Sequence, residues 1–171
     1  GPLIGALMRP LGGWLSDKLG GAQVTFWNFI AMAAGVAGVL AFLPQAGTGG
    51  NFYAFLAMFM VLFMTAGIGN GSTFRMIPAI FLEARQREAA GKGRAALEQA
   101  ARDANTEAAA VLGFSSAIGA YGGFFIPMSY GVSISMTGTA ASALYVFIVF
   151  YLTCIAMTWW FYSRRSAEIL V

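Results

Sequence analysis

The chain has 171 residues, of which 58% are hydrophobic and 10% are charged, and its formal net charge is +3. Because soluble domains carry about 25% charged residues, this composition excludes a water-soluble globular domain and predicts a membrane protein. The absence of histidine excludes a Ser-His-Asp triad and a histidine-ligated metal or haem. We therefore expect no enzyme and no metal site, and we attribute the positive charge to membrane-flanking loops, not to a nucleic-acid partner.

The charged residues leave two long gaps in the sequence, at 19–74 and 108–163. A helix as long as either gap would extend about 84 Å, against a hydrocarbon core of about 30 Å, so each gap must cross the bilayer, turn and cross back. Turn-forming residues predict the first turn at 44–51, and Ser, Thr and Gly predict a softer one around 131–139. The predicted class is an all-α membrane protein with spans at about 1–15 (partial), 23–43, 52–81, 108–130 and 140–163.

The positions of Lys and Arg predict the orientation of these spans. Positive residues occupy the connectors at 16–21 and 83–107 and the tail at 164–165, whereas the two opposite turns carry no charge. Short positively charged loops stay on the cytoplasmic side. We therefore expect a multi-pass protein of the plasma (inner) membrane with a cytoplasmic C-terminus.

The connector at 83–107 is the only stretch with the composition of a soluble protein. In its second half Arg94, Glu98 and Arg102 recur at intervals of four, which favours a solvated helix. We expect the next span to begin as a helix in the cytoplasm, with binding of a partner or regulator as the alternative.

Arg9 lies inside the first, partial span. It precedes the connector by about seven residues, which places it about 10 Å inside the bilayer. A guanidinium at such a depth costs about 3 kcal/mol on insertion scales, so it must face protein, water or a bound anion. Pro10 follows and lacks an N–H, which can leave a carbonyl free at the same depth. The alternative is a structural arginine bonded to neighbouring carbonyls.

Arg75 has a similar predicted depth, and Pro78 follows it. A long side chain near a helix end can reach the interface, so a direct role in substrate binding is one of two interpretations of Arg75. The other deep polar groups are neutral, and no predicted span contains Asp or Glu. A substrate bound here should therefore be an anion, and the planar donor fork of Arg suits a small planar oxyanion.

Small residues recur at helical spacing in two of the spans. Ser115, Gly119 and Gly123 are four residues apart, and Gly67 and Gly71 form a second pair. Small residues let membrane helices approach closely, and they also leave room for a small solute. Sequence spacing leaves both interpretations open.

Three stretches together indicate a family. The run from Gly13 to Gly21, GWLSDKLGG, resembles the loop motif G-x-x-x-D-[RK]-x-G of the major facilitator superfamily. The stretches GALMRPLGGWLSDKLGG from Gly5, GIGNGSTFRMIP from Gly67 and GFSSAIGAYGGFFIPMSYG from Gly113 are similar to the C-terminal half of the nitrate/nitrite porter (NarK-type) family.

This resemblance implies that the spans are helices eight to twelve of a twelve-helix carrier in the bilayer, whose N-terminal six-helix half would be missing. The start at Gly1, without Met or a signal peptide, agrees with a piece of a longer chain. The resemblance implies no cofactor. Arg9 would be one of two arginines that clamp nitrate or nitrite, and Gly119 would lie close to the anion. The candidate substrate-binding residues are Arg9, Asn70, Arg75, Ser115, Ser116 and Gly119. The loop motif that would latch the cytoplasmic side comprises Gly13, Asp17, Lys18 and Gly20.

The expected activity is nitrate or nitrite transport by alternating access, as nitrate/nitrite exchange or as nitrate uptake. The lack of an intramembrane carboxylate favours exchange, because an empty site with two positive charges would resist reorientation. The alternatives are a carrier for another small anion, a truncated product that acts only as an assembly partner, and an anion channel.

Overall fold

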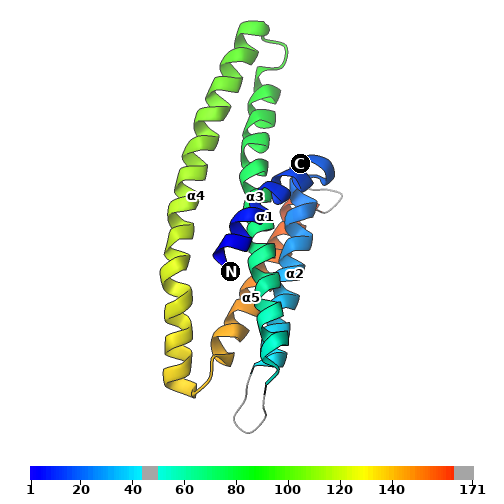
Figure 1. Cartoon of the computed structure of the whole chain (residues 1–171). Helices are drawn as coiled ribbons and strands as arrows, with labels where there is room; N and C mark the ends of the chain where they lie inside the picture. The colour runs from blue at the N-terminus through cyan, green and yellow to red at the C-terminus, as the bar shows by residue number, and fades with distance from the viewer. Residues whose placement is uncertain (44–49, 164–171) are drawn as a thin grey trace.

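The computed structural model describes residues 1–43 and 50–163, and this part of the chain is helical almost throughout (Figure 1). Its elements are α1 (Pro2–Leu19), α2 (Gly21–Phe42), α3 (Phe52–Ala89), α4 (Arg94–Thr137), α5 (Ala141–Thr158) and a closing π-helical turn, η1 (Trp159–Ser163). The predicted all-α class is confirmed. The predicted turn at 44–51 and the tail at 164–165 fall mostly or wholly outside the described residues.

Four of the described helices are long and apolar enough to cross a bilayer. They are α2, α3, α4 and the segment Ala141–Tyr162, which includes α5. The sequence predicted four full spans and one partial span, and the remaining helix, α1, carries Arg9, Asp17 and Lys18 among its 18 residues. Where the bilayer boundaries lie along these helices stays a prediction.

The turn before α5 is shorter than the sequence predicted. Helix α4 continues through most of 131–139 to Thr137, and the chain reverses at Gly138, whose φ of 74° suits glycine. Ser133 makes this compact turn possible, because its buried hydroxyl donates to the carbonyl of Thr139 at 2.7 Å and accepts from the N–H of Ala143 at 3.3 Å. Ser and Thr here cap a turn and do not break the helix.

The connector at 83–107 consists mainly of helix ends. Helix α3 continues to Ala89 and α4 begins at Arg94, so that only a short turn joins them. Gly91 and Gly93 adopt φ values of 80° and 93° in this turn, a conformation that other residues rarely adopt. In Figure 1 the two helices extend side by side well beyond α1 and α2.

The helices pack unequally. Helix α3 packs against α1, α2 and α4, and α5 packs against α2, where Val36, Val39 and Leu144 form a buried core. The buried residues of α4 lie near its two ends, and none is buried between 109 and 132. Among the described residues, no Cα atom of α4 approaches one of α1 within 8 Å. Helix α4 is therefore attached to the bundle at its ends only (Figure 1).

Candidate functional site

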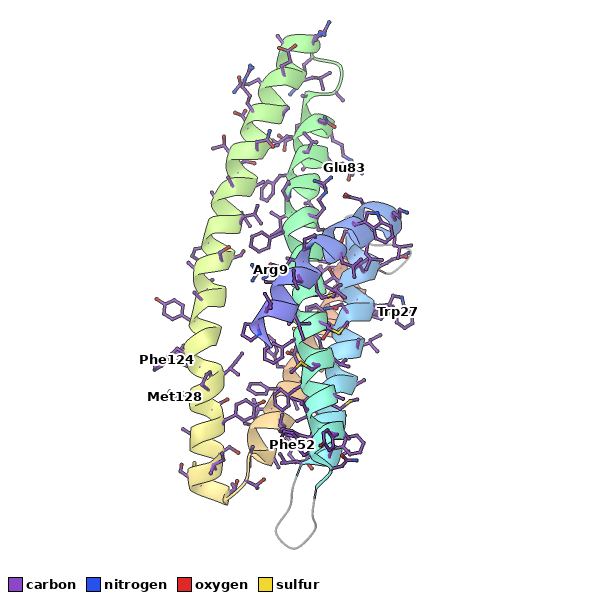
Figure 2. The ribbon with its side chains drawn as sticks, in the orientation of Figure 1. Arg9, Trp27, Phe52, Glu83, Phe124 and Met128 are labelled. Atoms are coloured by element: carbon purple, nitrogen blue, oxygen red, sulfur yellow. The ribbon has the colours of Figure 1, made fainter. Side chains whose placement is uncertain are left out.

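Arg9 lies in the middle of α1 with an exposed side chain. Within 1–43 and 50–163 its guanidinium forms no hydrogen bond or ion pair. Figure 2 shows Arg9 on the side of α1 along which α4 runs. Its donors are thus available to a ligand, and no neighbouring carbonyl in the described structure binds them.

The main chain of Arg9, in contrast, is tightly packed against α3. A Cβ atom placed on Gly71 would lie 2.0 Å from the carbonyl oxygen of Arg9, and one placed on Gly67 would lie 2.2 Å from that of Gly5. Such distances are shorter than any real Cβ contact, so the two helices touch through their backbones. The small residues of α3 therefore serve close packing, which is one of the two interpretations that their spacing left open.

A buried group of hydroxyls joins three helices next to this contact. Ser72 of α3 is 0% exposed. Its hydroxyl accepts from Ser16 of α1 at 2.7 Å, donates to the carbonyl of Gly21 at 3.2 Å, and lies 3.0 Å from the hydroxyl of Thr25 in α2. Because buried hydroxyls are costly without partners, this cluster fixes the α1–α2 turn on α3.

The loop motif is held at the surface of the same turn. Asp17 accepts a hydrogen bond from Nε of Arg75 at 2.6 Å, which ties the motif to α3. Lys18 lies over the ring of Trp14, with its Nζ 4.2 Å from the ring centroid. Gly20 ends α1 with a φ of 88°, so its place in the motif reflects a backbone conformation that favours glycine.

A cavity of about 410 Å³ adjoins the Asp17–Arg75 pair. It lies between the α1–α2 turn, the middle of α3 and Asn105 of α4. Both charges of the pair line it, so its wall carries no net charge from these two groups. The cavity is a water-accessible recess at the end of the bundle where the charged residues gather, and Arg9 is not among its lining residues.

The candidates on α4 lie away from Arg9. Ser115, Ser116 and Gly119 are exposed, and the Ser116 hydroxyl donates to the carbonyl of Leu112 in its own helix at 2.7 Å. Nothing lies within 4 Å of a Cβ atom placed on Gly119. The structure thus unites Asp17 with Arg75 but does not bring the α4 residues into contact with Arg9.

Asn70 of α3 precedes Gly71 in sequence, at the level where α3 touches the main chain of Arg9. Its side chain is half-buried. Asn70 is therefore the candidate on α3 closest along the chain to the Arg9 contact, while Gly13 of the loop motif makes only an ordinary contact, 3.9 Å from its Cβ position to the carbonyl of Gly71.

The extensions of α3 and α4 are joined by an ion cluster outside the apolar segments. Nε of Arg85 donates to Glu107 at 3.0 Å, its Nη2 contacts the other carboxylate oxygen of Glu107, and its Nη1 donates to Glu88 at 2.9 Å. The hydrogen bonds that Arg85 donates lower the pKa of the Glu107 carboxyl group. The same bonds raise the pKa of Arg85, the one to Glu107 more than the one to Glu88.

No family model matches the chain, but several curated proteins do. It is 53% identical over 167 residues to the nitrate/nitrite transporter NarU of Escherichia coli (strain K12), a match that covers 97% of the chain and 36% of that protein. It is 31% identical over 169 residues to the probable nitrate/nitrite antiporter NarK2 of Thermus thermophilus, covering 98% of the chain and 33% of that protein. It is 26% identical over 166 residues to the probable nitrate transporter NarT of Staphylococcus carnosus (strain TM300), a match that covers 97% of the chain and 35% of that protein.

The chain is a homologue of the NarK-type nitrate/nitrite transporters. It spans about a third of the length of the curated relatives that it matches. The homology and the four long apolar helices make it a multi-pass membrane protein. Its all-helical architecture is consistent with part of a major facilitator bundle.

Sequence reasoning missed part of what holds these helices together. A Cβ atom on Gly12 would lie 2.1 Å from the carbonyl oxygen of Ile68, whereas the neighbouring motif residue Gly13 has room. Gly5 and Gly12 are seven residues apart and so share one face of α1, a spacing that could have indicated the contact. The partner of Asp17 could not have been found in this way, because Arg75 is far away in the sequence.

Proposed function

We propose that the chain forms part of a carrier that moves nitrate or nitrite across the inner membrane by alternating access, and that the carrier is not an enzyme. The support is its similarity to transporters whose names specify nitrate and nitrite. A further six-helix half would complete the carrier, because facilitators of this class bind substrate between two bundles. The α1–α2 turn next to Lys18 and the α3–α4 turn with Lys92 would face the cytoplasm together with the C-terminus.

The observation that carries the proposal is the unpaired guanidinium of Arg9. An arginine in an apolar helix requires a compensating partner, and the described residues supply none. Nitrate offers the planar oxygens that a guanidinium fork binds best. Asn70, Ser115, Ser116 and Gly119 would line the remainder of the site when the bundle is complete, and Arg75, already paired with Asp17, would hold the loop motif instead of the anion.

Arg9→Lys in the full-length protein tests this role, because lysine keeps the charge but lacks the planar fork. We expect the Kd for nitrate, measured by isothermal titration, to rise at least about tenfold, since losing one charge-assisted hydrogen bond costs about 1.5 to 3 kcal/mol. Arg75→Lys is the matched control, and its Kd should stay within about twofold of the parent value. Unchanged nitrate affinity in Arg9→Lys would exclude Arg9 from the site.

Proteoliposomes of the same protein distinguish the transport modes and the substrates. The name of the Thermus thermophilus relative includes antiporter, which favours exchange. Internal nitrite should then accelerate nitrate uptake, and uptake that needs a proton gradient and ignores internal nitrite would exclude obligatory exchange. Competition by nitrite but not by a panel of carboxylates would separate a nitrate carrier from a carrier of other small anions.

A further inference from the structure

Arg9 has a fixed backbone and a free side chain. Its guanidinium forms no bond within the described residues, so side-chain partners do not determine where its donors lie. Its carbonyl oxygen, however, lies 2.0 Å from the Cβ position of Gly71, and its carbonyl carbon and Cα lie 2.9 and 3.1 Å from that position. Three main-chain atoms of Arg9 therefore rest on one glycine of α3.

We infer that Gly71 is a positioning residue for anion binding, because it sets the place of Arg9 without touching the anion. The inference rests on the proposed function of Arg9. A methyl group at position 71 would have to reach at least 3.4 Å from the carbonyl oxygen for an ordinary contact, so the backbone of α1 would retreat by more than an ångström. A misplacement of about 1 Å at a functional group can cost up to about 100-fold in the performance of a site. Here the affinity of Arg9 for the anion would fall.

The neighbouring contacts prevent α1 from adapting by rotation alone. A turn earlier, a Cβ atom placed on Gly67 would lie 2.2 Å from the carbonyl oxygen of Gly5, and at the other end one placed on Gly12 would lie 2.1 Å from that of Ile68. Both are backbone contacts and neither can yield by a change of rotamer. Helix α1 is thus fixed on both sides of Arg9, and a substitution at Gly71 acts on the middle of a clamped segment.

Gly69 provides the matched control on the same helix. A Cβ atom there would lie 2.4 Å from Nδ2 of Asn28 in α2, so Gly69→Ala introduces the same methyl group into a close contact that does not involve α1. The amide of Asn28 is the end of a side chain and can turn away, whereas the carbonyl of Arg9 cannot. Gly67→Ala adds a second reference, because its shortest contact is with the backbone of Gly5, one helical turn from Arg9, and its contact next to Arg9 is with the Cβ of Met8 at 2.9 Å.

The experiment measures nitrate Kd and apparent melting temperature for these variants in the full-length protein. We expect Gly71→Ala to raise the Kd for nitrate about tenfold or more, Gly67→Ala to raise it less, and Gly69→Ala to leave it within about twofold. A purely structural defect would reduce the amount of folded protein but not the Kd of the folded fraction. Equal Kd values for Gly71→Ala and Gly69→Ala would overturn the inference.

A second measurement applies if Gly71→Ala does not fold. In the unsubstituted protein, nitrate should slow hydrogen exchange of the amides around Arg9 and around Gly71 together, and Arg9→Lys should abolish both effects. Protection confined to α1 would overturn the inference. Arg9→Lys also separates the two hypotheses: if it leaves nitrate affinity unchanged, the proposed function fails, and if it weakens binding while Gly71→Ala matches Gly69→Ala, only the role of Gly71 fails.

Discussion

Ser72 is the residue on which the end of the bundle depends most directly. Its hydroxyl is fully buried and lies within hydrogen-bond distance of Ser16 in α1 and of Gly21 and Thr25 in the first turn of α2. Each of these partners would lose a bond if the hydroxyl were removed, while the site would remain closed to water. The cost of unpaired buried groups exceeds the net gain from a hydrogen bond, so one oxygen atom stabilises the junction of three helices.

Ser72→Ala should therefore destabilise the protein by about 1 to 3 kcal/mol, seen as a drop of several degrees in the apparent melting temperature of the full-length protein. Ser135→Ala is the control, because Ser135 is exposed and bonds only to Val132 in its own helix. Equal melting temperatures for the two variants would show that the buried cluster contributes nothing.

At the scale of elements, the extensions of α3 and α4 form a helical pair of their own. Ala100, Ala104 and Ala108 are buried at intervals of four on α4, and small residues allow α3 to approach closely. Arg85 connects the two helices through Glu107 at the level where the pair enters the bundle. The attachment of this end of α4 thus depends on the three alanines and a partly buried ion pair.

Acidification should loosen this attachment. Arg85 lowers the pKa of Glu107 in the folded protein. The ion pair therefore stabilises the attachment fully when the pH is above the ordinary carboxyl pKa of about 4.3. This stabilisation is lost as the pH falls from there through the lowered pKa. Spin labels at the exposed positions 86 and 106 should report a broader distance distribution at pH 3 than at pH 7. Glu107→Gln should show the broader distribution already at pH 7, and Glu98→Gln, whose partner Arg94 is 3.7 Å away in the same helix, should behave like the parent. A distribution that does not change with pH would refute this role.

Helices whose ends are marked by local residues could be predicted from the sequence, whereas features that depend on contacts between distant residues could not. Helices α2 and α3 could be predicted because their apolar stretches are bounded by turn-forming residues or charges. Asn51 caps α3 by accepting a bond from the N–H of Ala54. The continuation of α4 through 131–137 could not, because the bonds of Ser133 become visible only when the turn has formed. Arg9 was identified from its depth alone, whereas the contact with Gly71 depends on which helices become neighbours.

At the scale of the molecule, the segment divides into a packed part and an arm. Helices α1 and α3 touch through their backbones, a hydroxyl cluster joins both to α2, and α5 packs against α2. The middle of α4 stands apart, and nothing lies within 4 Å of Cβ positions on Gly113, Gly119 and Gly123. The small residues of α1 and α3 are packed within this segment, while the glycines in the middle of α4 remain open to other parts of the proposed carrier.

Gly119→Leu should consequently abolish nitrate transport without impairing folding. The added side chain meets no neighbour in this segment and would project into the space that the proposed anion path requires. The measurement is nitrate uptake by proteoliposomes, with melting temperature as the test of folding. Gly131→Leu is the matched control, since Gly131 lies on the same helix with equal room but outside the Ser115 to Gly123 run. Equal uptake by both variants would mean that the run does not border the path.

The contact between Gly71 and the backbone of Arg9 also determines how force passes through the molecule. Where two helices meet through main-chain atoms, no flexible side chain lies between them to absorb a displacement. In the proposed carrier, a displacement of α1 caused by the arriving anion would also displace α3, including the segment that carries Arg75. Helices α1 and α3 would then move as one rigid unit, and the charge of the bound anion would act on this unit at Arg9.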